Sequence, residues 1–238
     1  MSTIKKPIAL ITGATGCIGS AITKKMINNG FFVVGIGRNK LKGIRMNHEL
    51  GKKNFSFHSI DVGSYEEIES MFKEDIFKNN TLELVITCAG ILKMDKTDNF
   101  PVESWNEIIK TNLTGTFYFL KESLKLMKKN NRGSIISIGS RWGESGAKNA
   151  AAYSASKSAL RALIKSVQLE CVNTKIRCLL ISPGSVSSDM SNYVKNDISD
   201  KLLDARDIAE LIAYISKTPD HVIFDEITMK AFPYDLLN

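Results

Sequence analysis

Two hydrophobic patterns alternate along the chain. Short runs rich in apolar and β-branched residues predict strands at 7–12, 31–37, 54–61, 82–88, 133–139, 175–182 and 222–229. Between them, apolar residues recur at helical spacing and predict helices at 18–29, 64–77, 105–129, 153–172 and 205–217. Since each strand–helix–strand crossover must pack back onto the sheet, this order predicts an α/β fold, a doubly wound parallel sheet of about seven strands with helices on both faces.

The alternation also bears on domain organisation. A chain of 238 residues can form one α/β domain or two small ones, so length alone does not decide. No Pro/Ser-rich linker, repeat or low-complexity tract interrupts the pattern, which predicts one domain over 1–238. The first apolar run is too short and too broken by glycine for a signal peptide. No stretch approaches the ~18 apolar residues of a membrane span, and we expect no membrane contact.

Composition and charge narrow the function. With 43% hydrophobic and 24% charged residues, the chain has an ordinary globular composition, which excludes disordered and disulfide-scaffold classes. The net charge of +7 suits an anionic cofactor or an acidic carrier protein, but the lysines are scattered, which argues against nucleic acid. Cysteines at 17, 88, 171 and 178 form no CxxC pair and no ligand spacing with histidine. We expect free thiols, a reducing cytoplasm and no metal site.

A glycine-rich turn joins the first predicted strand to the first helix. It reads Thr12-Gly13-Ala14-Thr15-Gly16-Cys17-Ile18-Gly19. Glycines permit a tight turn and let backbone N–H groups approach a pyrophosphate at the helix N-terminus. Such a turn also occurs without a ligand, but its place in an alternating chain favours a dinucleotide. The expected contacts of the dinucleotide are Gly13, Thr15, Gly16, Cys17, Ile18 and Gly19.

The end of the second predicted strand indicates which dinucleotide is bound. It reads Gly37-Arg38-Asn39 and carries no carboxylate, which would bind the ribose 2′-OH and repel a 2′-phosphate. Arg38 instead suits a 2′-phosphate through charge-assisted hydrogen bonds, and Asn39 can add a neutral one. The alternative is an arginine that points to solvent and selects nothing. The pattern favours NADP(H) over NAD(H).

Further along the chain, a serine, a tyrosine and a lysine are separated by specific numbers of residues. Ser140 ends a predicted strand, where ligands bind in open α/β sheets, and Tyr153 follows 13 residues later. Tyr153 and Lys157 are four apart and therefore share one helix face. A lone YxxxK is common by chance, but its combination with the strand-end serine and the glycine turn is specific.

With these residues the chain resembles the short-chain dehydrogenase/reductase family, from residue 7 to about 229. The resemblance implies a Rossmann-type fold and hydride transfer between a nicotinamide and a carbonyl or secondary alcohol. Ser140, Tyr153 and Lys157 match the family's catalytic positions, and Asn112 matches a fourth member that holds a water relay. The resemblance also implies cofactor contacts from Asp61 and Val62 at the adenine, from Cys88, Ala89 and Gly90, and from Pro183, Gly184, Val186 and Ser188 over the nicotinamide.

The chemistry of the catalytic residues follows from their side chains. The ordinary pKa of tyrosine, about 10, is too high for acid–base work near neutral pH. A neighbouring Lys157 ammonium and an oxidised nicotinamide both favour the phenolate, so we expect them to lower the pKa of Tyr153. The Ser140 hydroxyl can hydrogen-bond the substrate oxygen while Tyr153 gives or takes the proton. Lys157 can also hold the ribose hydroxyls and connect, through water and Asn112, to solvent.

The chain departs from the family's pattern at three places. Its glycine spacing resembles extended members that act on nucleotide sugars, with Cys17 where common short members have glycine. The chain after Ser182 is too short for their larger substrate domain, so we expect a common-form fold with an unusual loop and an altered cofactor affinity. Thr87 and Cys88 replace the usual Asn-Asn, which predicts some loss of bracing. The tail lacks the acidic-Gly-Gly ending of acyl-carrier reductases and resembles a strand edge packed on a partner subunit.

Three functions remain open. The leading one is an NADP(H)-dependent carbonyl reductase or alcohol dehydrogenase acting on a small, medium or 3-oxoacyl substrate. The second is a binding or regulatory protein that keeps the cofactor without catalysis, which the intact residue set opposes. The third is a nucleotide-sugar epimerase or dehydratase, which the chain length opposes. The segment 189–203 is the expected substrate lid, and Trp142 and Tyr193 are candidate pocket walls, although packing roles suit them equally.

The resemblance further implies a homodimer or homotetramer. Family members pair their long helices, here 105–129 and 153–172, across the subunit interface. The apolar residues expected to supply that surface are Leu113, Phe117, Leu124, Leu160, Leu163 and Val167, several of which must also face the sheet.

Overall fold

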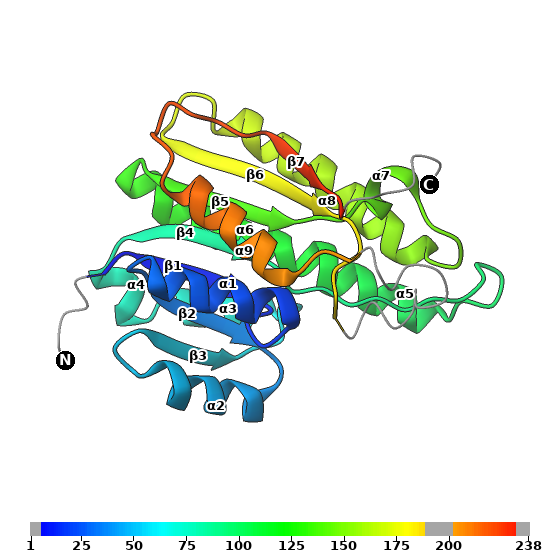
Figure 1. Ribbon diagram of the computed structural model, residues 1–238, viewed down its shortest axis with the longest axis horizontal. Coiled ribbons are helices and arrows are strands. Elements are labelled where there is room, and N and C mark those ends of the chain that lie inside the picture. The colour runs from blue at the N-terminus through cyan, green and yellow to red at the C-terminus, as the bar shows by residue number, and fades with distance from the viewer. Residues whose placement is uncertain (1–5, 189–201, 232–238) are drawn as a thin grey trace.

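The computed structural model describes residues 6–188 and 202–231, and its centre is one sheet of seven parallel strands (Figure 1). In spatial order these are β3 (Phe55–Ser59), β2 (Phe32–Gly37), β1 (Ile8–Thr12), β4 (Leu82–Thr87), β5 (Gly133–Ile138), β6 (Ile176–Pro183) and β7 (Glu226–Met229). All seven predicted strands are confirmed, although the last begins at Glu226 rather than at 222. The winding direction reverses between β1 and β4, which opens a crevice at the carboxyl ends of these strands.

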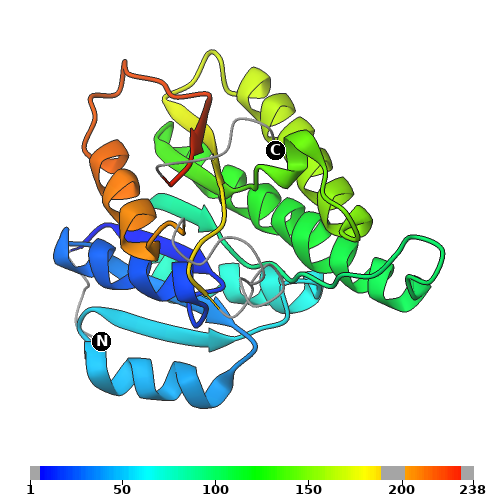
Figure 2. The ribbon, with the colours of Figure 1, turned by 45° about the vertical axis from the view of Figure 1, so that its right-hand side comes forward.

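Helices cover both faces of the sheet, and Figure 2 separates the two layers. One face carries α1 (Cys17–Asn28), α2 (Lys40–Leu50) and α9 (Ala205–Ser216). The other carries α3 (Tyr65–Phe72), α4 (Asp75–Asn79), α6 (Gly115–Asn130) and α8 (Ala151–Glu170), with α5 (Val102–Ile109) packed on α8. Each layer forms its own hydrophobic core, so β1, β2 and β5 are buried along their whole length.

The predicted helix at 105–129 is a longer, composite element. It begins at Val102, and α5 continues through a π-helical turn at Lys110–Thr114 into α6. A π-turn widens the helix locally and commonly marks a functional position. Asn112 lies within this turn.

Other helices differ from the sequence-based expectation. The helix predicted at 64–77 is two helices, α3 and α4, separated at Lys73 and Glu74. Helix α2 and the short α7 (Trp142–Ser145) were not predicted. Helix α2 buries only Gly43 and Met46, so its sequence carries little apolar periodicity.

The expected subunit surface needs correction at two residues. Leu160 and Val167 are buried in the core against the sheet and cannot face a partner. Leu113, Leu124 and Leu163 are partly buried and pack on the same core. Phe117, 46% exposed on α6, is the predicted residue that does point outward.

At the amino-terminal edge of the sheet, Arg177 of β6 makes hydrogen bonds to the neighbouring strand and to a loop. Its guanidinium donates to Ser134 Oγ of β5 at 3.1 Å and to Thr218 Oγ1 at 3.0 Å. It also reaches the carbonyls of Thr218 and Pro219, both at 3.2 Å, in the connection between α9 and β7. One side chain therefore ties two central strands to the last crossover.

The segment expected to form the lid begins at the carboxyl edge. Most of 189–203, Tyr193 included, lies outside the described residues, as does the tail from 232 onward. At its two ends, Val186 and Leu203 form a parallel bridge, with Ser187 N–H donating to the Leu203 carbonyl at 2.9 Å. Within 6–188 and 202–231, no helix is both long and apolar enough to cross a membrane.

Candidate active site

A cavity of about 530 Å³ occupies the crevice at the carboxyl ends of the strands. Its walls come from the β1–α1 turn, from the segments after β2, β4 and β5, from α8 and from the end of β6. Nearly all residues predicted to contact the cofactor line it: Gly13, Thr15, Gly16, Cys17, Ile18, Gly19, Arg38, Asn39, Val62, Cys88, Ala89, Gly90, Tyr153, Lys157, Pro183, Gly184, Val186 and Ser188. Ser140 lines it as well.

The glycine turn is closed so tightly that side chains are excluded at two positions. Gly13 has φ +66°, and a Cβ there would lie 2.9 Å from the backbone of Ala89. A Cβ at Gly19 would lie 2.1 Å from the Gly13 carbonyl oxygen. Gly16 is less confined, and its N–H donates to the Gly13 carbonyl at 2.8 Å. The first turn of α1 is thereby pressed against the end of β1, with its N-terminus at the cavity.

Cys17, the residue that departs from the common pattern, starts α1. Its exposed thiol donates to the Ser187 carbonyl, with Sγ 3.2 Å from the oxygen. The side chain thus joins the glycine turn to the segment after β6, which forms the opposite wall of the cavity.

Arg38 and Asn39 form the end of the cavity that follows β2. Asn39 caps α2, because its side chain accepts the Lys42 N–H at 3.0 Å. Arg38 is 57% exposed, and its guanidinium Nη1 lies 3.7 Å from Glu107 Oε1 of α5. Glu107 belongs to no motif, and sequence reasoning missed it.

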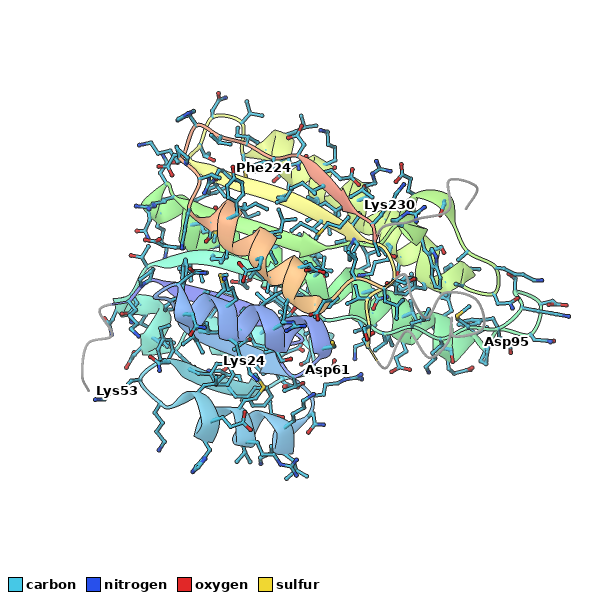
Figure 3. All side chains as sticks on the ribbon, in the orientation of Figure 1. Lys24, Lys53, Asp61, Asp95, Phe224 and Lys230 are labelled. Atoms are coloured by element: carbon cyan, nitrogen blue, oxygen red, sulfur yellow. The ribbon has the colours of Figure 1, made fainter. Side chains whose placement is uncertain are left out.

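Asp61, which the resemblance places at the adenine, lies at the carboxyl edge of the sheet (Figure 3). Its neighbours Ile60 and Val62 line the cavity, and Asp61 itself does not. Its carboxylate accepts the Gly63 N–H at 3.0 Å and pairs with Lys110 at 3.4 Å. The Gly63 N–H in particular, together with Lys110, lowers the pKa of Asp61, so the carboxylate beside the cavity is held ionised.

Hydroxyl groups make hydrogen bonds around Thr87 and Cys88, where the sequence predicts some loss of bracing. Thr87 Oγ1 donates to Ser137 Oγ at 2.7 Å, which joins β4 to β5. Thr12 Oγ1 accepts the N–H groups of Cys88 at 3.0 Å and Ala89 at 3.1 Å. Burial raises the pKa of the Cys88 thiol to about 12, so it stays protonated.

Ser140 and Tyr153 meet at the other end of the cavity. Ser140 follows β5 and accepts the Trp142 N–H at 3.2 Å, and its hydroxyl is close enough to Tyr153 to lower the pKa of the phenol. The edge of the Trp142 ring contacts Tyr153, with centroids 6.0 Å apart and planes at 89°. Trp142 lines the cavity, as expected for one of the two candidate pocket walls. Tyr153 thus has Ser140 and Trp142 as neighbours.

The expected lowering of the Tyr153 pKa is not found in the protein alone. Burial raises this pKa, and the neighbouring Ser140 hydroxyl offsets only part of the effect. Lys157 Nζ lies 5.7 Å from the centre of the tyrosine ring and donates instead to the Ile138 carbonyl at 2.8 Å. Burial lowers the pKa of Lys157 to about 8, so its protonated form is less favoured than that of an exposed lysine.

Asn112 does not line the cavity but supports its wall. Its Oδ1 accepts the Ile91 N–H at 2.8 Å, and its Nδ2 donates to the Ile91 carbonyl at 3.0 Å and to Ser156 Oγ at 3.1 Å. The π-turn thus fixes the loop after β4 against α8. The cavity also has walls that no motif pointed to: Ile60, Ile91, Leu92, Thr111, Ile138, Gly139, Arg141 and Ser185.

A switch-point cavity lined by a helix N-terminus at one end and by a serine and a tyrosine at the other is typical of oxidoreductases that bind a nicotinamide dinucleotide. Comparison with known proteins agrees: the short chain dehydrogenase family matches residues 7–199. An uncharacterized oxidoreductase of Staphylococcus epidermidis is 31% identical over 231 residues, 97% of this chain and 99% of the relative. The chain therefore belongs to the short chain dehydrogenase family and is an oxidoreductase.

Solved structures show the same likeness. A closed form of serine dehydrogenase complexed with NADP⁺ superposes with a TM-score of 0.89 at 26% identity, over 97% of both chains. A variant of actinorhodin polyketide ketoreductase with NADPH gives 0.87 at 26% identity, over 96% of this chain and 97% of that one. In the described part of this chain, no group of three or more His, Cys, Asp or Glu side chains is placed to hold a metal ion.

Proposed function

We propose that the protein is an NADP(H)-dependent oxidoreductase that interconverts a carbonyl group and a secondary alcohol, in a small, medium or 3-oxoacyl substrate. The observation that carries the proposal is that Ser140, Tyr153 and Lys157 line one cavity together with the glycine turn and Arg38. The NADP⁺ and NADPH complexes of the serine dehydrogenase and the ketoreductase support the choice of cofactor.

The cavity suits such a dinucleotide along its whole length. The closed glycine turn presents the N-terminal N–H groups of α1, which are donors for a pyrophosphate. Arg38 and Asn39 would hold a 2′-phosphate at one end. Near the other end, Lys157 Nζ lies beside Gly90: a Cβ added to this glycine would be 3.7 Å from it. From this position the ammonium group can reach the ribose hydroxyls.

Ser140, Tyr153 and Lys157 have separate roles in the proton transfer. When bound, the nicotinamide supplies or accepts the hydride. Ser140 orients the substrate oxygen, and Tyr153 gives that oxygen a proton in reduction or takes it in oxidation. The Lys157 ammonium, 5.7 Å from the ring, stabilises the phenolate that Tyr153 becomes. Asn112 and Trp142 keep the loop and the tyrosine ring in place.

The test is Tyr153→Phe, assayed with NADPH and a panel of ketones and 3-oxoacyl thioesters. Removing only the transferable proton is expected to lower kcat by about 10²–10⁴-fold. The Kd for NADPH, measured by fluorescence titration, is expected to stay within about twofold, because the phenyl ring still fills its place. Tyr214→Phe, at an exposed position of α9, is the matched control.

Two outcomes would contradict the proposal. A Tyr153→Phe enzyme as fast as the parent would overturn the acid–base role. A parent that binds NADPH but turns over no carbonyl in the panel, and no alcohol with NADP⁺, would indicate a binding protein instead.

A further inference from the structure

A small group of charges surrounds the Arg38 end of the cavity. Glu107 of α5 lies between two cations, with Oε1 3.7 Å from Arg38 Nη1 and Oε2 2.6 Å from Lys93 Nζ. Lys93 comes from the loop after β4 and also donates to Ser104 Oγ at 3.3 Å. Arg38 is distant in sequence from Lys93 and Glu107, and only the fold brings it beside them.

The two contacts of Glu107 are unequal. The Lys93 contact is a short charge-assisted hydrogen bond, whereas 3.7 Å is too long for a hydrogen bond to Arg38. Lys93 is also the main cause of the lowered pKa of Glu107, and Arg38 is a lesser one. Glu107 is thus held ionised by Lys93 while it attracts Arg38 without binding it.

We propose that Glu107 tunes the selectivity between NADP(H) and NAD(H) by competing with the 2′-phosphate for Arg38. This rests on the proposed function, in which Arg38 receives that phosphate. A carboxylate beside Arg38 offers the guanidinium a partner other than the 2′-phosphate, whereas binding through a ribose 2′-OH meets no such competition. Lys93 limits the effect because it draws Glu107 away. Glu107 is a positioning residue that acts through Arg38.

The exposure of both side chains sets the size of the effect. Arg38 is 57% exposed and Glu107 40%, so solvent and salt screen their attraction. Surface pairs of this kind change an equilibrium by roughly two- to fivefold. Glu107→Gln is therefore expected to lower the Kd for NADPH about two- to fivefold and to leave the Kd for NADH unchanged. The difference is expected to shrink as ionic strength rises.

Fluorescence or calorimetric titration of both cofactors tests this without relying on turnover. Glu103→Gln is the matched control: it makes the same charge change in the first turn of the same helix. Lys93→Met is expected to act in the opposite direction and weaken NADPH binding, because Glu107 is then free to pair with Arg38. Equal shifts in Glu107→Gln and Glu103→Gln would overturn the proposal.

A double-mutant cycle separates this inference from the function on which it rests. In an Arg38→Met background, Glu107→Gln is expected to leave the NADPH/NADH ratio unchanged. The same shift persisting there would show that the freed Lys93, not Arg38, responds, and would overturn the proposal. If Arg38→Met itself left the ratio unchanged, the proposed NADP(H) preference would fail with it. A ratio that depends on Arg38 but not on Glu107 overturns only the role of Glu107.

Discussion

Lys157 is a cation enclosed at the centre of the site, 6% exposed, with its Nζ on the Ile138 carbonyl. Burial lowers its pKa from 10.5 to about 8. Between these values the unfolded chain binds more protons than the folded one, so this residue makes stability rise with pH across the window from about 8 to 10.5. Below pH 8 the cost of burying the charge is fully present.

The prediction is a difference in pH dependence between the parent and Lys157→Met. From pH 8 to 10, the parent is expected to gain stability relative to the variant, by at most about 1.4 kcal/mol per pH unit. Urea midpoints measured along this range check it, with Lys165→Met, exposed on the same helix, as the control. Parallel pH curves for the parent and Lys157→Met would contradict it.

At the level of single residues, the sequence predicted well where chemistry fixes both residue type and spacing. Ser140, Tyr153 and Lys157, which the motifs single out, line one cavity. The contacts of Asp61 with Gly63 and Lys110 could not be predicted from its motif, because Lys110 approaches it only in the fold. The same holds for Glu107, since its effect depends on Arg38 and Lys93, which only the tertiary fold brings near.

The β1–α1 turn is an element in which two glycines have unequal roles. A Cβ at Gly19 would meet the Gly13 carbonyl oxygen at 2.1 Å, whereas at Gly16 the nearest atom is that same oxygen at 3.2 Å. Gly19→Ala must therefore push α1 away from β1, which is expected to cost about 1–3 kcal/mol of stability and to weaken NADPH binding. Gly16→Ala needs only a small local shift. Thermal melting and cofactor titration of the two variants check this, and equal losses would contradict it.

Strands and helices could be predicted where burial requires apolar residues at a regular spacing along the sequence. The strands were found because a sheet covered on both faces needs continuous apolar runs. Helix α2 was not predicted because it buries only Gly43 and Met46 fully and leaves Leu41 and Ile44 exposed. The π-turn around Asn112 has no sequence period of its own, since it depends on the side-chain contacts of Asn112 with Ile91 and Ser156.

For the whole molecule, we propose self-association through the layer that contains α5 and α6. Val102, Trp105 and Phe117 are 66%, 42% and 46% exposed along these consecutive helices. Large apolar side chains at such positions are typical of protein–protein contacts. Of the two helices that the resemblance places at the subunit contact, 105–129 and 153–172, this proposal uses the first.

Phe117→Asp is expected to shift a dimer or tetramer toward the monomer, because a carboxylate would be buried at the contact without a partner. Sedimentation velocity at micromolar concentration measures the change. Tyr214→Asp is the control, since Tyr214 is 64% exposed on α9, on the opposite face of the sheet. A monomeric parent, or an equal shift in both variants, would contradict the prediction.

The hydrogen bonds of Arg177 lie at the edge of the sheet opposite the cavity, and this separation has an evolutionary consequence. Its hydrogen bonds to Ser134, Thr218 and Pro219 hold strands and crossover together without using any residue that lines the cavity. Mutations that alter substrate preference can therefore accumulate at the carboxyl edge without loosening this anchor. A lineage built on this plan can exchange its specificity while natural selection keeps the scaffold constant.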